Sequence, residues 1–117
     1  MFKRNLQLYI KDILESANAI KQYINNMDYE TFSQDRKTFS ATIREYIIIG
    51  EAITALMEIL EEKLPEYPWR MVKDFRNLII HEYFGVDSKI VWDLTTKELD
   101  ELVKNIRILE KQIKNSN

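Results

Sequence analysis

Apolar residues recur at intervals of three and four positions along most of this chain, and this spacing is the strongest constraint on its fold. In the first such segment they are Leu6, Ile10, Ile13, Leu14, Ala17, Ile20 and Ile24. A helix turns about 100° per residue, so these side chains share one face of an amphipathic helix over residues 6–25. The same spacing returns near the other end, at Leu99, Leu102, Val103, Ile106, Leu109 and Ile113. Both segments therefore predict helices that bury one apolar face.

A second long helix is predicted from Asp35 or Arg36 to about Lys63, where the prolines of "LPEYP" end it. Its centre, "YIIIGEAITALM" at residues 46–57, is apolar nearly all round. A helix of this kind is covered on more than one side, and in a chain this short we expect a second subunit to supply part of the cover. Gly50 costs about 1 kcal/mol relative to alanine in mid-helix, which indicates that another helix crosses it closely.

The third predicted helix spans residues 68–82 and has two different faces. On a helical wheel its expected core arc holds Met71, Val72, Phe75, Leu78 and Ile79. The opposite arc holds Arg70, Lys73, Asn77 and His81, with Arg76 at its edge. His81, the only histidine in the chain, is therefore predicted to leave the core. Ile80 lies on the same polar arc, which indicates that a partner covers part of this surface.

The remaining segments complete an all-α prediction. A short helical turn is expected in "NNMDYETFSQD", and a short helix in "SKIVWDL" before the last long one. The chain has only two glycines and two prolines, so turn signals for a sheet are nearly absent. We predict a single domain over residues 1–117, an up-and-down bundle of four main helices with one or two short extra helices.

The composition also narrows the compartment and the partners. The chain has no cysteine, which excludes disulfides and thiolate metal sites. Charges interrupt the first apolar stretch, unlike a signal peptide, and no segment has membrane-spanning length, so we expect a cytoplasmic protein. The net charge is -2, from 17 basic and 19 acidic residues, so a nucleic acid partner must be met by a local patch. For RNA the candidates are Arg70 and Lys73 beside Arg76, and no DNA partner is expected.

The polar arc of the third helix carries groups that can cleave RNA. A lone histidine on such an arc is usually only solvated, but His81 shares its arc with Asn77 and has Arg76 nearby. Histidine can accept a proton from the ribose 2′-hydroxyl near neutral pH, and arginine can stabilise charge on the phosphate that this oxygen attacks. The leaving oxygen also needs a proton, and a two-fold dimer would supply it from a second His81. No metal-ligand spacing or phosphate-binding glycine loop is present, so we expect no cofactor.

At this point the residues resemble a known family. "PWRMVKDFRNLIIHEYFGVD" is similar to the signature region of the HepT-like proteins of the HEPN superfamily, whose pattern is R-x4-H followed by x-Y. Here the pattern gives Arg76, His81 and Tyr83, with Asn77 in the polar position after the arginine. "DRKTFSATIREYIIIGEA", residues 35–52, looks like the family's other recognisable block, and "VWDL" also fits. The likeness extends over nearly the whole chain.

The resemblance implies a function. It implies a HEPN bundle that forms a homodimer and acts as a metal-independent RNA endonuclease, the toxin of a type VII toxin–antitoxin system, with Arg76, Asn77 and His81 as catalytic residues. It also implies a partner, an MntA-like minimal nucleotidyltransferase antitoxin that neutralises the toxin by transferring AMP to the motif tyrosine, here Tyr83. A nucleotide two residues from His81 would add bulk and negative charge where an RNA phosphate has to bind.

Two other interpretations remain open from the residues. The chain could be a binding module without chemistry, which docks a nucleotidyltransferase or binds a nucleotide or RNA through the motif. It could also be a structural dimer in which His81 and Arg76 only cap and solvate the third helix. Alanine at His81 would impair RNA turnover in an enzyme, but partner binding in a binding module.

Overall fold

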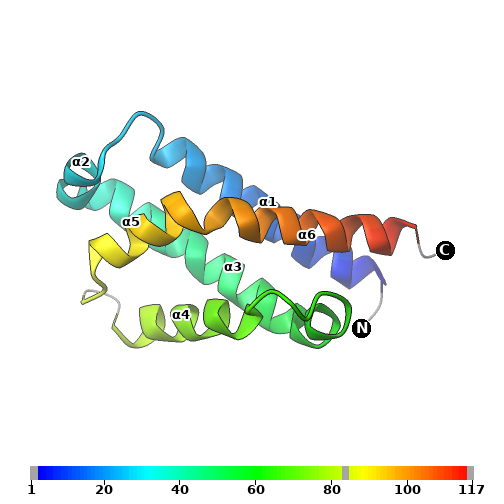
Figure 1. Cartoon of the computed structure of the whole chain (residues 1–117). Coiled ribbons are helices and arrows are strands. Elements are labelled where there is room, and N and C mark those ends of the chain that lie inside the picture. The colour runs from blue at the N-terminus through cyan, green and yellow to red at the C-terminus, as the bar shows by residue number, and fades with distance from the viewer. Residues whose placement is uncertain (1–2, 83–84, 116–117) are drawn as a thin grey trace.

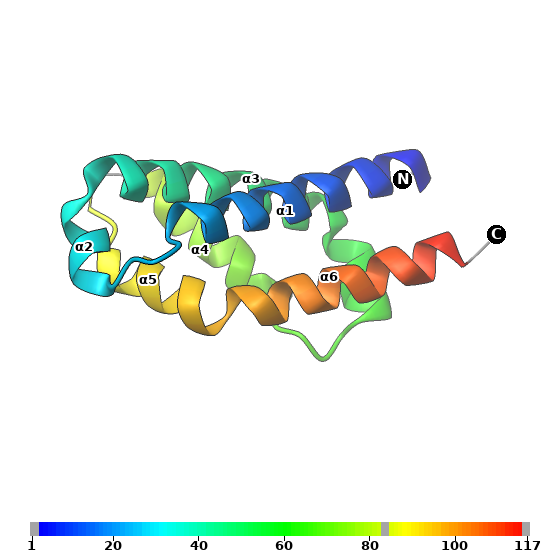
Figure 2. The same cartoon turned by 90° about the horizontal axis from the view of Figure 1, so that it is seen from above.

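The computed structural model describes residues 3–82 and 85–115 and is an all-α bundle (Figure 1). Its described part forms six helices, which are α1 (Lys3–Tyr23), α2 (Tyr29–Gln34), α3 (Arg36–Lys63), α4 (Trp69–His81), α5 (Ser88–Lys97) and α6 (Leu99–Lys114). The chain runs up and down: α1, α3 and α4 alternate in direction, and α5 and α6 together form the last pass (Figures 1 and 2). The predicted fold class and the boundaries of the long helices are confirmed to within a few residues.

The core is built from the apolar spacing of α1 and α6. Its buried side chains in these helices are Ile10, Ile13, Ala17, Ile20, Leu99, Leu102, Ile106, Leu109 and Ile113. They pack on one another and on α3, which contacts both α1 and α4. Burial of these faces removes apolar surface from water, and this is the main stabilising term for a bundle. Among the described helices, none is both long and apolar enough to cross a membrane.

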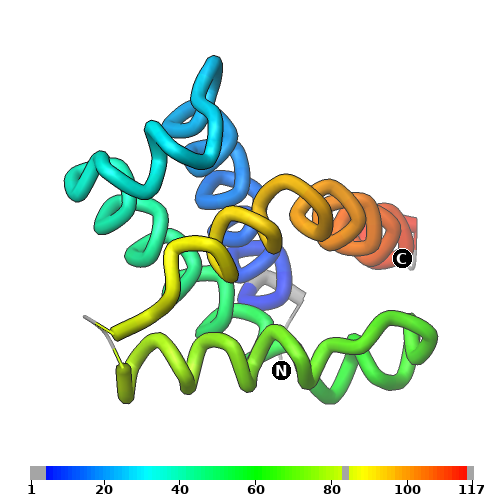
Figure 3. Tube along the Cα trace, turned by 60° about the vertical axis from the view of Figure 1, so that its left-hand side comes forward, coloured from blue at the N-terminus to red at the C-terminus, as the bar shows by residue number. Residues whose placement is uncertain are grey.

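Helix α3 is covered on more than one side, as its composition predicts. It lies between α1 and α4 (Figures 1 and 3), and Ile49, Ile53 and Leu56 in its centre are at most 1% exposed. Among the described residues, the large apolar side chains that stay exposed belong to other helices: Leu8, Met71, Leu78, Ile80, Ile90 and Ile108. The same chain therefore covers much of α3, while Ile47, Ile48 and Met57 stay partly exposed. The second subunit expected beside α3 stays a prediction.

Aspartate side chains cap the N-termini of α2 and α3. The carboxylate of Asp28 accepts a hydrogen bond from the Thr31 backbone N–H at 2.8 Å, and that of Asp35 accepts one from Thr38 at 3.0 Å. Each bond satisfies a donor at a helix start. These backbone hydrogen bonds hold the pKa of both carboxyl groups below the ordinary value. Aspartate at the N-cap position therefore defines where α2 and α3 begin.

The orientation of α4 differs from the wheel prediction. Trp69 and Ile79 are buried, and Val72 and Phe75 pack partly buried against the core. Met71 and Leu78, both expected in the core, are 42% and 44% exposed. The inward-facing row is instead Trp69, Val72, Arg76 and Ile79, spaced at three and four residues. The prediction is wrong for Met71 and Leu78 because α4 is rotated so that its arginine faces α3.

Candidate functional site

The motif arginine packs directly on α3 at Gly50. A Cβ atom added at Gly50 would lie 2.3 Å from Cβ and 2.5 Å from Cγ of Arg76. Carbon atoms in contact are normally about 3.5–4.0 Å apart, so only glycine fits at this crossing. The expected close crossing at Gly50 is confirmed. The expectation that Arg76 lies at the edge of the polar arc is wrong, because the apolar stem of an arginine can be buried while its charged end reaches the surface.

Two side chains hold the guanidinium of Arg76. Its Nη1 donates a hydrogen bond to Oδ1 of Asn77 at 2.9 Å, and its Nη2 lies 3.8 Å from Oε1 of Glu51. The Nε donor is buried and has no hydrogen-bond partner among the described residues. A buried donor without a partner is unfavourable, and this cost is opposed by the hydrogen bond to Asn77, the ion pair with Glu51 and the packing of the stem on Gly50. The structure thus brings together Arg76, Asn77 and Glu51, the last of which was not identified from the sequence.

His81 is the last residue of α4, and its side chain is exposed. It follows Arg76 by five residues, which on a helix corresponds to about 7.5 Å along the axis and about 140° around it. Within one chain the imidazole and the inward-facing guanidinium therefore leave α4 on different sides. His81 is confirmed as a residue outside the core. Tyr83, the predicted modification site, lies outside the described residues.

The two predicted RNA-binding residues of α4 lie at different distances from His81. Arg70 is in the first turn of α4, about 16 Å along the axis from His81, and its Nε lies 3.3 Å from Oε2 of Glu61. Lys73 is half-buried and lies one turn before Asn77, on the same side of the helix. Arg70 lies about 10 Å before Asn77 along the axis, so a phosphate bound beside Asn77 would be nearer to Lys73 than to Arg70.

The chemistry available here is proton transfer and phosphate binding. The exposed imidazole of His81 can exchange protons with a bound molecule, and a guanidinium offers donors that match phosphate oxygens. Over residues 3–82 and 85–115, no group of three or more His, Asp or Glu side chains is arranged to hold a metal ion. The motif residues thus offer acid–base and electrostatic chemistry on a nucleic acid backbone.

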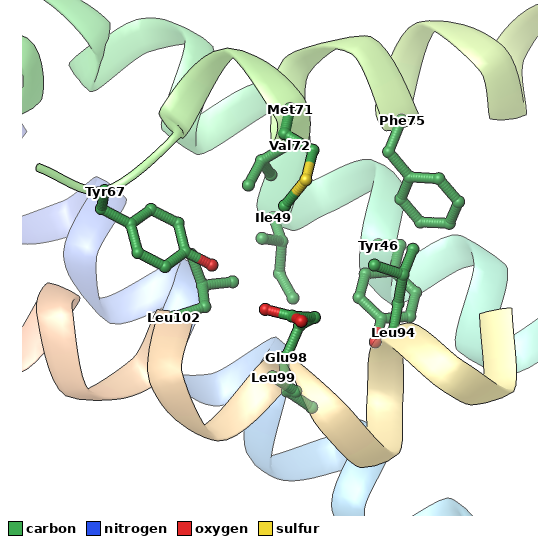
Figure 4. A pocket seen from close by; sticks show the side chains of 10 residues that line it. All are labelled: Tyr46, Ile49, Tyr67, Met71, Val72, Phe75, Leu94, Glu98, Leu99 and Leu102. Carbon is green, nitrogen blue, oxygen red and sulfur yellow. The ribbon is translucent and has the colours of Figure 1, made fainter. Parts of the chain in front are cut away.

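An apolar groove lies on another side of α4, between this helix and α5 and α6 (Figure 4). Its volume is about 160 Å³, and its lining residues are Tyr46, Ile49, Tyr67, Met71, Val72, Phe75, Leu94, Glu98, Leu99 and Leu102. The carboxylate of Glu98 points into the groove (Figure 4). Burial raises the pKa of Tyr67 to about 12, and the negative charges of the nearby Glu98 and Glu101 contribute to the rise. None of Arg76, Asn77 and His81 lines this groove.

Sequence comparisons point to one class of protein. A family model described as Ribonuclease HepT-like matches residues 13–109. A candidate RNase of Methanocaldococcus jannaschii is 35% identical over 113 residues, covering 91% of this chain and 93% of its own. A candidate RNase of Caldanaerobacter subterraneus is 34% identical over 105 residues, covering 89% and 94%. A candidate ribonuclease HepT of Thermococcus cleftensis is 34% identical over 109 residues, covering 93% and 99%. No solved structure matches the chain.

Proposed function

The chain belongs to the family of HepT-like ribonucleases, and on that premise we propose that it is a metal-independent RNA endonuclease with Arg76, Asn77 and His81 in its active site. One observation carries the proposal. The Arg76–Asn77 pair, joined by a hydrogen bond of 2.9 Å, is followed at the end of the same helix by an exposed histidine. A cation, an amide and a proton-transfer group within six residues are the groups that RNA cleavage without a metal requires.

The proposed reaction uses the RNA's own hydroxyl as the nucleophile. His81 accepts the proton of a ribose 2′-hydroxyl, and the O2′ atom attacks the adjacent phosphorus. The bond from phosphorus to O5′ breaks, and O5′ takes a proton from a second, protonated imidazole. Arg76 stabilises the negative charge that builds up on the phosphate oxygens. The products are one fragment with a 2′,3′-cyclic phosphate and one with a free 5′-hydroxyl, and no water is consumed in this step.

A homodimer supplies the second imidazole in this proposal. Each chain has one histidine, and within a chain it points away from Arg76 by about 140°. A two-fold axis near the end of α4 would bring both copies of His81 and both copies of Arg76 to one cleft. Ile80 supports an interface here, because it lies between Arg76 and His81 in the sequence, is 46% exposed, and would be stabilised by being covered.

We further propose that the dimer is the toxin of a type VII toxin–antitoxin system in the cytoplasm. Its antitoxin would be an MntA-like minimal nucleotidyltransferase that transfers AMP to Tyr83. The phosphodiester and the nucleotide would stand two residues from His81, where they would repel and block an RNA phosphate. Lys73, and further along α4 also Arg70, would attract the RNA backbone.

Cleavage in the absence of metal tests the proposed function. We expect the purified chain to cut total RNA in buffer containing EDTA and to leave 2′,3′-cyclic phosphate ends, because the imidazole and guanidinium replace a metal ion. End-group analysis of the fragments by mass spectrometry measures this. Cleavage that needs added Mg²⁺ or Mn²⁺, or fragments with 5′-phosphate ends, would contradict the mechanism.

Tyr83→Phe separates toxicity from neutralisation. Phenylalanine keeps the ring but lacks the hydroxyl that accepts AMP, so we expect the variant to remain toxic when the nucleotidyltransferase is produced with it. Growth of cells that produce both proteins, and the mass of the toxin after incubation with ATP and the partner, are the measurements. AMP found on the Tyr83→Phe variant at the level of the parent would contradict this role of Tyr83.

The apolar groove favours a second candidate function, a binding module that docks a nucleotidyltransferase without cleaving RNA. Met71 and Leu94 line the groove from both sides, and Met71 is 42% exposed. An exposed apolar groove of this kind marks an interaction surface. A partner whose binding is impaired by Met71→Glu, combined with the absence of RNA cleavage by the parent chain, would favour this function over the ribonuclease.

A further inference from the structure

We infer that Glu51 on α3 is a positioning residue for the ribonuclease reaction, because it holds the guanidinium of Arg76 in place from outside the motif helix. The inference rests on the proposed function of Arg76 as the phosphate-stabilising group. It concerns a carboxylate outside the R-x4-H segment, 25 residues before the arginine that it contacts.

The first step is the position of the arginine stem. Gly50 leaves space on α3 for Cβ and Cγ of Arg76, which approach to 2.3 and 2.5 Å from where a glycine substituent would be. The stem is therefore held against the backbone of α3. Glu51 follows Gly50 directly, so its backbone position relative to this stem is determined by the same helix crossing.

The second step is the set of contacts that hold the guanidinium of Arg76. Asn77 accepts a hydrogen bond from Nη1 at 2.9 Å, and the Glu51 carboxylate faces Nη2 at 3.8 Å. Nε is buried and makes no hydrogen bond within the part of the chain that the structure describes. The guanidinium is therefore held through its two terminal nitrogens, one by its own helix and the other by α3. Loss of Glu51 would leave a single contact, about which the planar group could turn.

The third step is access for a substrate. Each terminal nitrogen carries two N–H groups, and Asn77 uses only one of those on Nη1. The Arg76 side chain is 26% exposed and that of Glu51 is 58% exposed, so a phosphate can approach the pair from solvent. Glu51 would orient the guanidinium and at the same time repel the phosphate. Orientation of the guanidinium would raise kcat, whereas repulsion of the phosphate would weaken RNA binding. Separate measurement of kcat and KM therefore distinguishes the two effects.

Glu51→Gln removes the charge and preserves the shape of the side chain. We expect kcat for RNA cleavage to fall about tenfold, because small misplacements of a group at a reacting centre lower rates by one to two orders of magnitude. We expect KM to stay the same or fall, because a negative charge near the bound phosphate is lost. A residue that only stabilises the fold would not produce this split.

Glu58→Gln is the matched control. Glu58 is exposed on the same helix, about 20° around the axis from Glu51 and about 10 Å further along it. The Glu58→Gln substitution removes the same charge from the same side of α3, two turns away from the ion pair between Glu51 and Arg76. We expect its kcat and KM to equal those of the parent. In an Arg76→Lys background, Glu51→Gln should cause no further loss of kcat, since Glu51 acts through the guanidinium.

A second measurement decides the inference without relying on activity. The buried Nε–H of Arg76 can be followed by NMR, with Arg76→Lys used to assign its signal. We expect its hydrogen exchange to accelerate in Glu51→Gln and to stay unchanged in Glu58→Gln, because the guanidinium leaves its position more often. Unchanged exchange in Glu51→Gln would overturn the inference, whatever its kcat. If the parent chain cleaves no RNA, the proposed function fails, and the exchange rates alone decide whether Glu51 positions Arg76.

Discussion

His81→Ala is expected to lower RNA cleavage by about 10⁴-fold or more. A positioned acid or base contributes about 10²–10⁴-fold to a proton-transfer reaction. In a two-fold dimer, one substitution removes both the base that accepts the 2′-hydroxyl proton and the acid that protonates O5′. The residual rate would come from the arginines and from RNA binding. Single-turnover cleavage of a defined RNA in EDTA measures the change, and the same variant should no longer arrest growth when it is produced in cells.

The fold should be unaffected by this substitution. His81 is exposed and is the last residue of α4, where alanine is at least as good a helix former. We therefore expect the same thermal melting temperature and the same sedimentation mass for the parent and for His81→Ala. Lys97→Ala, at the exposed last residue of α5, serves as a control for substitution at a helix end and should cleave RNA like the parent. A purified His81→Ala protein that cuts RNA at the parent's rate would contradict the assignment of the catalytic residue.

The boundaries of the helices could be predicted because the signals for them are local. The apolar spacing in α1 and α6 depends only on the helical repeat, and burial follows it closely at Ile10, Ile13, Ile106 and Leu109. The start of α3 could likewise be predicted, because Asp35 caps it through a bond to a residue three positions away. Such contacts are visible within a few neighbouring residues of a sequence.

The rotation of α4 could not be predicted in the same way. A wheel that separates apolar from charged residues assigns Met71 and Leu78 to the core and Arg76 to its edge. The structure has the reverse, because the stem of Arg76 packs on a glycine in another helix. This contact depends on which residue of α3 lies opposite α4, and that information is tertiary. Trp69 was missed as a core anchor for a related reason: its indole N–H donates to the Leu64 carbonyl at 2.8 Å across the α3–α4 connection.

The residues of the candidate site likewise differ in whether the sequence alone identifies them. Arg76, Asn77 and His81 could be found from their types and spacing on one helix. Glu51 lies within the block at residues 35–52 that resembles the family, but no role could be assigned to it, because glutamates are frequent on exposed helix faces. Gly50 was the signal that another helix crosses α3 closely, although it did not say which one. A costly glycine in mid-helix indicates a close crossing, and the residue beside it is a candidate for contact with whatever crosses.

Gly50→Ala is expected to destabilise the protein and to impair catalysis together. In an exposed helix this change would stabilise by about 1 kcal/mol through helix propensity. Here the new methyl group would lie 2.3 Å from Cβ of Arg76 and 2.5 Å from Cγ. Cγ could rotate away, but Cβ is attached to the backbone of α4 and can move only with the helix. We therefore expect overpacking to dominate, at a cost of about 1–3 kcal/mol in the free energy of unfolding.

The loss of cleavage by Gly50→Ala should exceed what its stability explains. Moving α4 away from α3 would separate Arg76 from Glu51, so we expect at least about a tenfold fall in kcat at a temperature where the variant is fully folded. Urea denaturation and single-turnover cleavage are the two measurements. Gly85→Ala is the matched control, because a Cβ there would be 3.4 Å from Oε2 of Glu82, an ordinary contact. We expect it to change the free energy of unfolding by less than about 0.5 kcal/mol.

Arg76→Ala in the Gly50→Ala background distinguishes a clash between backbones from one between side chains. Alanine at position 76 removes Cγ but retains Cβ, the atom 2.3 Å from the added methyl group. The truncation should therefore restore little of the stability lost in Gly50→Ala. Recovery of the parent's stability in the double variant would mean that only the arginine side chain met the methyl group, and that α3 and α4 cross less closely than the 2.3 Å separation requires. A Gly50→Ala variant more stable than the parent would contradict the close crossing itself, and with it the physical reason why Arg76 faces α3.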